Sequence, residues 1–230
     1  MHLTLYSFRI CPFVERTNIL INENNILCER IYVDIRNKPD WFLKLSPQGK
    51  VPLLKVDNTI IFESSVINDF LNEISTSKLY PSDPVKRAYN KSWIEWGSTL
   101  VFDAYNMTLA VNITSFKQQR IIVDKKLSVL ENEIEAQPFF NGNDFSMIDI
   151  AYAPLFRRFD RLSQQFDVHL LENFPKLKKW SENILMRDSV VKGFHENFDE
   201  ELYLLLKLKN SCLINRVEDI NNSPANSLKQ

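Results

Sequence analysis

The chain has 230 residues, of which 28 are Lys or Arg and 29 are Asp or Glu, so its formal net charge is −1. Nucleic-acid binding needs a basic field that this balance does not supply, and we expect no nucleic-acid partner. The 44% of hydrophobic and 25% of charged residues are typical of a folded globular protein, and the length suits two domains. Because no stretch has the pattern of a membrane helix or a signal peptide, we expect a cytoplasmic protein with no membrane partner.

The first part of the chain alternates strand and helix patterns. In chain order we predict a strand over 3–7, a helix over 14–24, a strand over 30–35, a short helix from Pro39, strands over 53–56 and 59–62 around the turn Asp57-Asn58, and a helix over 66–74 capped by Ser64 or Ser65. The resulting order, β-α-β-α-β-β-α, is the thioredoxin topology. The sequence therefore predicts an α/β, thioredoxin-like domain over residues 1–77.

The remainder of the chain is expected to be all-helical. A segment rich in Ser and Pro predicts a linker over 78–86. Helical patterns follow at about 84–110, 116–136, 147–165, 175–187 and 198–210. We therefore predict a C-terminal helical bundle domain over 87–214. Residues 215–230 are polar and are predicted to form a tail.

Cys11 is the residue that most directly indicates chemistry. It follows the first predicted strand and precedes Pro12 at the start of a helix, where free N–H groups and the positive end of the helix dipole favour a thiolate. Arg9 and Arg16 add positive charge nearby, so we expect a lowered thiol pKa. Because Val14 stands where a dithiol oxidoreductase carries its second cysteine, an external small-molecule thiol must resolve any mixed disulfide. The alternative is an inert cysteine packed behind the helix.

The remaining cysteines and the histidines do not suggest a metal site. Cys28 and Cys212 are expected to act as small apolar residues. The histidines His2, His169 and His195 lack ligand spacing relative to the cysteines, so we expect no metal.

Two further segments can bind polar groups of a ligand. Val51-Pro52 precedes the third strand, and a cis bond there would present the backbone of Val51 to an extended peptide; a trans turn is the alternative. Glu63-Ser64-Ser65 leads into the third helix, where hydroxyls and N–H groups form an anion site and Glu63 can hold an ammonium group. Plain helix capping is the alternative for this segment.

Taken in order, these segments resemble the glutathione transferase superfamily, and within it the omega class. The resemblance extends over roughly residues 3–200. It is carried by 9–17 (RICPFVERT), 37–42 (NKPDWF), Val51-Pro52, 62–65 (FESS), 79–84 (LYPSDP) and 146–149 (SMID), the last being similar to the superfamily's capping box. It implies that the first domain binds glutathione as co-substrate, that the helical domain faces a small electrophilic or disulfide substrate, and that the protein is a homodimer.

The resemblance also implies a role for each matching residue. Cys11 matches the cysteine that forms a mixed disulfide with glutathione. The residues implied to bind glutathione are Lys38 at the glycine carboxylate, Val51 and Pro52 at the cysteinyl part, Glu63 and Ser64 at the γ-glutamyl end, and the apolar Phe13 and Ile35. Trp180 matches a tryptophan that faces the second substrate, with core packing as the alternative.

The main hypothesis is an enzyme, a glutathione-dependent thiol transferase or reductase. Cys11 would react with a mixed disulfide, dehydroascorbate or an activated glutathione conjugate, and a second glutathione would release it from the mixed disulfide. Two other interpretations stay open. One is a non-enzymatic adaptor of the stringent-starvation type that binds RNA polymerase, against which the presence of Cys11 argues. The other is a glutathione-dependent dehalogenase or ether-cleaving enzyme, which shares the same cysteine chemistry.

Overall fold

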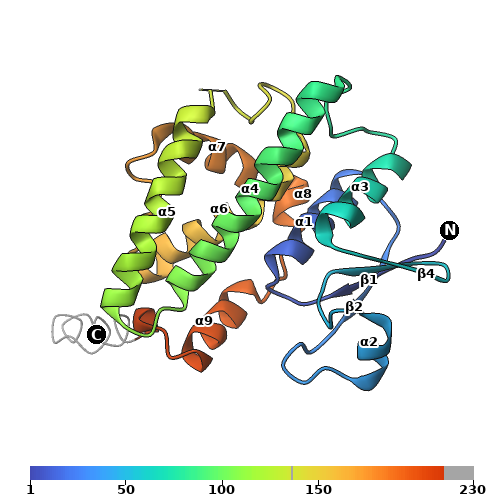
Figure 1. The fold of residues 1–230 in the computed structure, drawn as a ribbon, viewed down its shortest axis with the longest axis horizontal. Helices are drawn as coiled ribbons and strands as arrows, with labels where there is room; N and C mark the ends of the chain where they lie inside the picture. The colour runs from blue at the N-terminus through green and yellow to red at the C-terminus, as the bar shows by residue number, and fades with distance from the viewer. Residues whose placement is uncertain (136, 215–230) are drawn as a thin grey trace, which may run out of the picture.

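The computed structural model describes residues 1–135 and 137–214, and the predicted tail over 215–230 lies outside the described residues. The described chain forms a sheet domain followed by a helical domain, as predicted (Figure 1). The elements of the first are β1 (Leu3–Ser7), α1 (Pro12–Glu23), β2 (Glu29–Tyr32), α2 (Asp40–Leu45), β3 (Leu53–Val56), β4 (Thr59–Phe62) and α3 (Ser64–Ile74). Those of the second are α4 (Pro84–Thr108), α5 (Ile113–Glu133), α6 (Met147–Phe166), α7 (Pro175–Leu185), α8 (Asp188–Val191) and α9 (Phe198–Leu208).

The sheet has the strand order β2-β1-β3-β4, with β1 and β2 parallel and the other pairs antiparallel. Because side chains alternate across a strand, Leu3 and Leu5 of β1 belong to the core shared with α1 and α3. Tyr6 points the other way and packs against Phe42 of α2. Figure 1 shows α2 on one side of the sheet and α1 with α3 on the other. This arrangement confirms the predicted thioredoxin-like topology.

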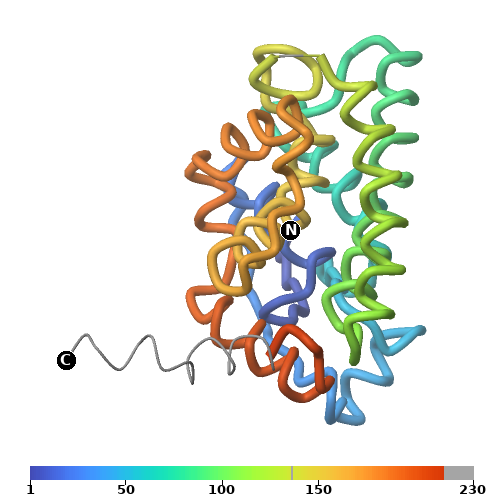
Figure 2. The backbone as a smooth tube through the Cα atoms, turned by 90° about the vertical axis from the view of Figure 1, so that its left-hand side faces the viewer, coloured from blue at the N-terminus to red at the C-terminus, as the bar shows by residue number. Residues whose placement is uncertain are grey.

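In the helical domain, α6 packs against both α4 and α7, and the long helices α4 and α5 run side by side (Figures 1 and 2). Gly97 allows α4 to approach α6 closely, because a Cβ atom there would lie 2.6 Å from Cζ of Tyr152. The predicted capping box begins α6: Asp149 accepts a hydrogen bond from the N–H of Ser146 at 2.8 Å. Since α6 also packs against α1, it connects the helical domain to the sheet domain.

The structure differs from the predicted elements in a few places. β2 ends at Tyr32, although the alternating pattern continues to Ile35, because the parallel pairing with β1 ends there. Glu63, rather than a serine, is the N-cap of α3. The short α8 escapes sequence prediction because a single turn shows no helical period. α4 begins at Pro84, inside the segment predicted as a linker, and the domain limits remain predictions.

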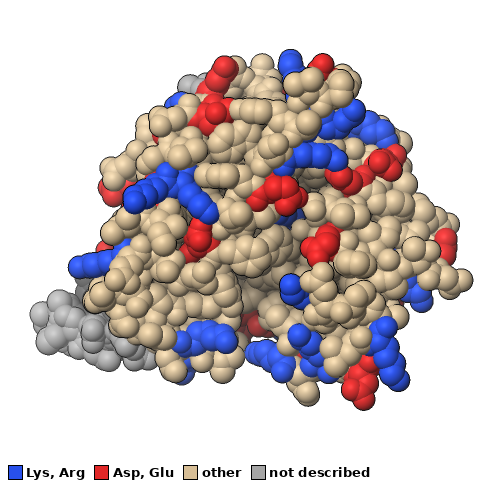
Figure 3. Space-filling model, viewed as in Figure 1, with Lys and Arg blue, Asp and Glu red and all other residues tan. Residues whose placement is uncertain are grey.

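The surface of the molecule carries both signs of charge. On the face drawn in Figure 3, Lys and Arg are interspersed with Asp and Glu, and the surface is hollowed between the two domains. Among the described residues, no helix combines the length and the apolarity needed to cross a bilayer.

Candidate active site

A groove between the sheet domain and α4 brings most of the predicted site residues together. Its volume is about 450 Å³. The predicted residues that line it are Cys11, Phe13, Ile35, Lys38, Val51, Pro52, Glu63 and Ser64. Trp180 lies elsewhere. Loops and element ends of the sheet domain thus meet at one place, while the role of each side chain there remains a prediction.

Cys11 is the N-cap of α1, and Pro12 is the first helical residue. The carbonyl oxygen of Cys11 accepts the first helical hydrogen bond, from the N–H of Glu15 at 3.0 Å. Its thiol lies 3.9 Å from the carbonyl oxygen of Val51, which follows from the packing of the β1–α1 loop against the segment before β3. The Val51–Pro52 peptide bond is cis, one of the two states that the sequence left open. Cys11 is half-buried and lies in the wall of the groove.

Burial raises the pKa of the Cys11 thiol above its ordinary value, which contradicts the lowered pKa expected from the sequence. The backbone N–H groups of Val14 and Phe13 act in the lowering direction, as expected at a helix N-terminus, but they do not outweigh the loss of water. Of the nearby charges, Glu15 raises the thiol pKa and Arg158 lowers it. The thiolate population therefore depends on burial together with charges from both domains.

The two arginines that were expected to assist Cys11 have other partners. Arg9 forms an ion pair with Glu201 of α9, with 2.7 Å between Nη1 and Oε1. Arg16 is buried, and its Nε donates to the carbonyl oxygen of Ala151 in α6 at 2.8 Å. Both partners lie far along the chain, so sequence proximity to Cys11 does not reveal them.

Sequence reasoning missed residues that the helical domain contributes. Arg158 of α6 forms an ion pair with Glu15, 143 positions away, and no local pattern signals such a pair. Glu95, Ser98 and Phe102 of α4 also line the groove. Their spacing of three and four residues places them on one face of a helix, which the sequence shows, but it does not show what that face meets.

The groove also has polar lining residues, among them Gln48, Glu63, Ser64 and Ser65. Glu63 has a φ of 68°, a left-handed backbone conformation that a non-glycine residue rarely adopts. Its carboxylate accepts a hydrogen bond from Nε2 of Gln48 at 2.9 Å. Ser64 and Ser65 begin α3, where backbone N–H groups are free to bind an anion. Lys38 lines the same groove, so the groove as a whole offers partners for both carboxylate and ammonium groups.

Trp180 does not line the groove, which corrects the role inferred from the resemblance. Its side chain is fully buried, and its ring centroid lies 5.0 Å from that of Tyr152 and 4.9 Å from that of Phe156. Its Nε1 donates to the carboxylate of Asp149 at 2.7 Å. The indole therefore belongs to the core of the helical domain, the alternative stated above.

The other cysteines are free thiols outside the groove. Cys28 precedes β2 and Cys212 follows α9, and both are partly buried against the core. Within the part of the chain that the structure describes, no three His, Cys, Asp or Glu side chains are grouped so that they could hold a metal ion.

Comparison with known proteins adds to this geometry. Residues 10–74 match a family model for the N-terminal domain of glutathione S-transferase, and residues 113–183 match one for its C-terminal domain. The chain is 30% identical over 217 residues to glutathione S-transferase omega-1 of Sus scrofa, which is 91% of this chain and 87% of that protein. It is 28% identical over 190 residues to the chloroplastic glutathione S-transferase DHAR3 of Arabidopsis thaliana, which is 82% of this chain and 70% of that protein. The crystal structure of glutathione transferase Omega 3C from Trametes versicolor is similar with a TM-score of 0.77 and 26% identity, over 85% of this chain and 90% of that one.

Proposed function

Because the chain belongs to the glutathione S-transferase family and is similar to its omega class, we propose that it is a glutathione-dependent thiol transferase in which Cys11 forms a mixed disulfide with glutathione. The observation that carries this proposal is the position of Cys11 in one groove with the residues that the resemblance assigns to glutathione. The thiolate form of a cysteine is itself a nucleophile, and the helix N-cap position of Cys11 favours that form. It therefore supports disulfide chemistry on the protein rather than activation of glutathione alone.

The proposed reaction consists of two thiol–disulfide exchanges. In the first, the Cys11 thiolate attacks the glutathionyl sulfur of a mixed disulfide, the Cys11–glutathione bond forms, and the substrate leaves as a thiolate. In the second, the thiolate of another glutathione attacks this bond, oxidised glutathione leaves, and the Cys11 thiolate is restored. The N–H groups of Val14 and Phe13 favour the reactive ionised form in the first step.

Two further substrate classes fit the same cysteine. Dehydroascorbate would take up two electrons and two protons while two glutathione molecules become one disulfide. An activated glutathione conjugate would lose its carbon–sulfur bond when Cys11 attacks the sulfur, and the carbon would take up a proton. The relative named DHAR3 and the omega-class relatives support this range.

The polar groups of the groove suit a tripeptide with charged ends. We assign Lys38 to the glycine carboxylate, Glu63 to the γ-glutamyl ammonium, and Ser64 at the start of α3 to the γ-glutamyl carboxylate. The backbone of Val51 would pair with the cysteinyl part, because its carbonyl oxygen lies 3.9 Å from the Cys11 sulfur. The apolar walls of this assignment are Phe13, Ile35 and Pro52.

Replacement of Cys11 tests the proposal directly. Wild-type protein incubated with oxidised glutathione should gain the mass of one glutathionyl group, and Cys11→Ala should not. Cys28→Ala is the matched control, because that thiol lies outside the groove and its loss should change neither the mass gain nor turnover. Turnover is measured as glutathione-dependent reduction of a small mixed disulfide, and Cys11→Ala should reduce it to background.

Full thiol transfer by Cys11→Ala would disprove the proposal. Binding to immobilised glutathione without turnover of any tested substrate would favour the adaptor, and halide or ether cleavage exceeding disulfide reduction would favour the dehalogenase or ether-cleaving enzyme. We further propose a cytoplasmic homodimer that uses no metal, in keeping with the family, and light scattering after size exclusion tests the oligomeric state.

A further inference from the structure

Arg158 extends from α6 to the loop that carries Cys11. Its Nη2 donates to the carbonyl oxygen of Ile10 at 2.5 Å. The same guanidinium forms a two-pronged ion pair with Glu15, with 2.6 Å from Nη1 to Oε2 and 3.2 Å from Nη2 to Oε1. The side chain of Glu15 is 1% exposed and that of Arg158 is 15% exposed. Burial removes water from both charged groups, and the ion pair between them replaces part of the lost hydration.

These contacts fix the peptide group between Ile10 and Cys11 at both of its polar atoms. The carbonyl oxygen of Ile10 accepts from Arg158, and the N–H of Cys11 donates to the carbonyl oxygen of Phe8 at 3.2 Å. Nη1 of Arg158 also donates to the carbonyl oxygen of Pro154 at 2.8 Å, which anchors the side chain to its own helix. A residue of the helical domain thus holds the peptide group that immediately precedes the Cys11 side chain.

Helix α9 covers the other side of this guanidinium. The ring centroid of Phe198 lies 5.2 Å from Cζ of Arg158, a cation–π contact that shields the cation from solvent. Phe198 is itself 1% exposed. The guanidinium is consequently held by α1, α6 and α9 in one orientation.

We propose that Arg158, held by Glu15, is a positioning residue for Cys11 that fixes the Ile10–Cys11 peptide and directs a positive charge from the helical domain at the sulfur. This inference deepens the proposed function, since it takes Cys11 as the reacting group. It can nevertheless be tested without glutathione, because the reactivity of the thiol toward a simple alkylating agent reports its ionisation.

The titratable groups that interact with Cys11 come from three helices: Glu15 and Arg16 of α1, Tyr105 of α4, and Arg158 of α6. Glu15 raises the pKa of the Cys11 thiol and Arg158 lowers it. The two members of the ion pair therefore act in opposite directions on the same sulfur. Variants that remove one charge at a time can therefore separate the electrostatic effect of each member from the scaffold that the pair provides.

The experiment measures the rate of Cys11 alkylation by iodoacetamide against pH, with Cys28→Ala/Cys212→Ala as background so that one thiol reports. Glu15→Gln keeps an acceptor for Arg158 and removes the negative charge, so the thiol pKa should fall and alkylation at pH 7 should rise by about threefold. Glu15→Gln/Arg158→Met then removes the positive charge while residue 15 cannot titrate. Relative to Glu15→Gln, alkylation at pH 7 should fall by about tenfold.

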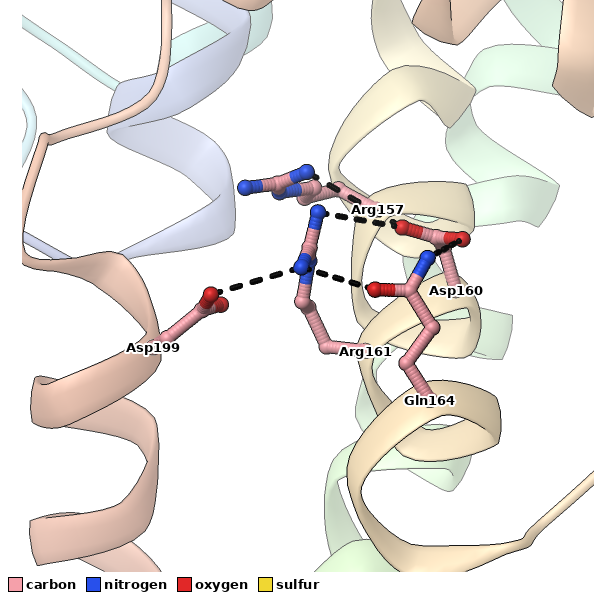
Figure 4. Close-up of polar contacts among 5 residues, drawn as sticks. All are labelled: Arg157, Asp160, Arg161, Gln164 and Asp199. Carbon is pink, nitrogen blue, oxygen red and sulfur yellow. Dashed lines mark hydrogen bonds and ion pairs between the residues drawn. The ribbon is translucent and has the colours of Figure 1, made fainter.

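A conservative replacement separates position from charge. Arg158→Lys keeps the charge but loses the planar fork that reaches Ile10 and Glu15 together, so kcat should fall at an unchanged KM for glutathione and a nearly unchanged alkylation midpoint. Arg161→Gln is the matched control on α6: its polar contacts are with Asp160, Gln164 and Asp199 (Figure 4), and it should leave the alkylation profile as in wild type.

Two results would overturn the two proposed roles of Arg158. Equal alkylation midpoints in Glu15→Gln and the double variant would overturn the electrostatic role, and wild-type kcat in Arg158→Lys would overturn the positioning role. If the double variant does not fold, as judged by thermal melting, Glu15→Gln alone still tests the proposal. An alkylation midpoint that is unchanged or raised relative to wild type would contradict it. Failure of glutathione chemistry alongside these alkylation shifts would disprove the proposed function but retain the role of Arg158.

Discussion

The two ends of α1 are each joined to the helical domain by a glutamate and an arginine, in different surroundings. At the N-terminal end, Glu15 pairs with Arg158 of α6, with side-chain exposures of 1% and 15%. At the C-terminal end, Glu23 accepts from Nε of Arg187 at 2.9 Å and from the hydroxyl of Ser189, and the exposures of Glu23 and Arg187 are 14% and 36%. The same two residue types thus make one pair whose carboxylate is almost fully buried and one in which water reaches both members.

This difference reverses the effect on the carboxyl group. Burial raises the pKa of Glu15, and the attraction of Arg158 does not outweigh it. Burial acts in the same direction on Glu23, but hydrogen bonds from Arg187 and Ser189 hold the pKa of that carboxyl below its ordinary value. Ionisation of Glu23 therefore stabilises the fold, whereas ionisation of Glu15 costs stability. We infer that the outer pair anchors α1, whereas the inner pair acts on Cys11.

The largest expected effect comes from removing each arginine. Arg158→Met leaves Glu15 buried without its partner and should lower the free energy of unfolding by about 3–5 kcal/mol. Arg187→Met leaves a carboxylate that water can reach and should cost about 1–2 kcal/mol. Urea denaturation at pH 7 measures both. Equal losses of stability in the two variants would contradict the difference that we infer between the ion pairs at the two ends of α1.

The second-largest expected effect concerns how stability depends on pH. The contributions of Glu15 and Glu23 to the free energy of unfolding should change with pH in opposite directions. The folded pKa of Glu23 lies below its ordinary value of 4.5, so its contribution is present above pH 4.5 and is lost as pH falls through the folded pKa. Glu23→Gln should therefore be less stable than wild type at pH 7, by about 1–2 kcal/mol, and the difference should shrink at acid pH. Denaturation midpoints from pH 7 down to pH 3 give this slope.

Glu15 should behave in the opposite way. Its folded pKa lies above 4.5, so its contribution is present below pH 4.5 and is lost as pH rises through the folded pKa. Glu15→Gln, which stays neutral, should gain stability relative to wild type as pH rises over that range. The same pH series tests it, and parallel slopes for Glu15→Gln and Glu23→Gln would contradict the assignment of burial as the cause of the difference.

The two ends of α1 also show what the sequence can predict. Strand alternation and helical periods predicted the fold, since these signals are local and the sheet and helix packing follow from them. The groove wall of the sheet domain was predictable too, because Cys11, Val51-Pro52 and Glu63-Ser64 each stand at an element end that the sequence marks. The raised pKa of Cys11 was not predictable, because burial depends on how the domains close over the sulfur.

The helical wall of the site shows where sequence reasoning stops. Arg158 is one of several charged residues along α6, and its sequence neighbours Arg157 and Arg161 have other contacts. Only the packing of α6 on α1 places Arg158 against Ile10 and Glu15. The predicted role of Trp180 was wrong for a related reason. A tryptophan in an amphipathic helix carries no local sign of whether it faces a ligand or the core, and Trp180 lies in the core.

The smallest expected effect concerns the partly exposed cluster between α6 and α9 drawn in Figure 4. Arg161 lies 3.3 Å from Oδ2 of Asp199 and also contacts Asp160 and Gln164, and Asp199 is 46% exposed. Water and salt screen such a pair, so Arg161→Gln should lower the free energy of unfolding by at most about 1 kcal/mol, with the loss diminishing at high salt. Urea denaturation at low and high ionic strength measures it. Because Arg161 sits one helical turn beyond Arg158, a loss as large as that of Arg158→Met would show that charge anywhere on this face of α6 matters equally. A small, salt-sensitive loss would instead assign the difference between the two arginines to the burial of Glu15.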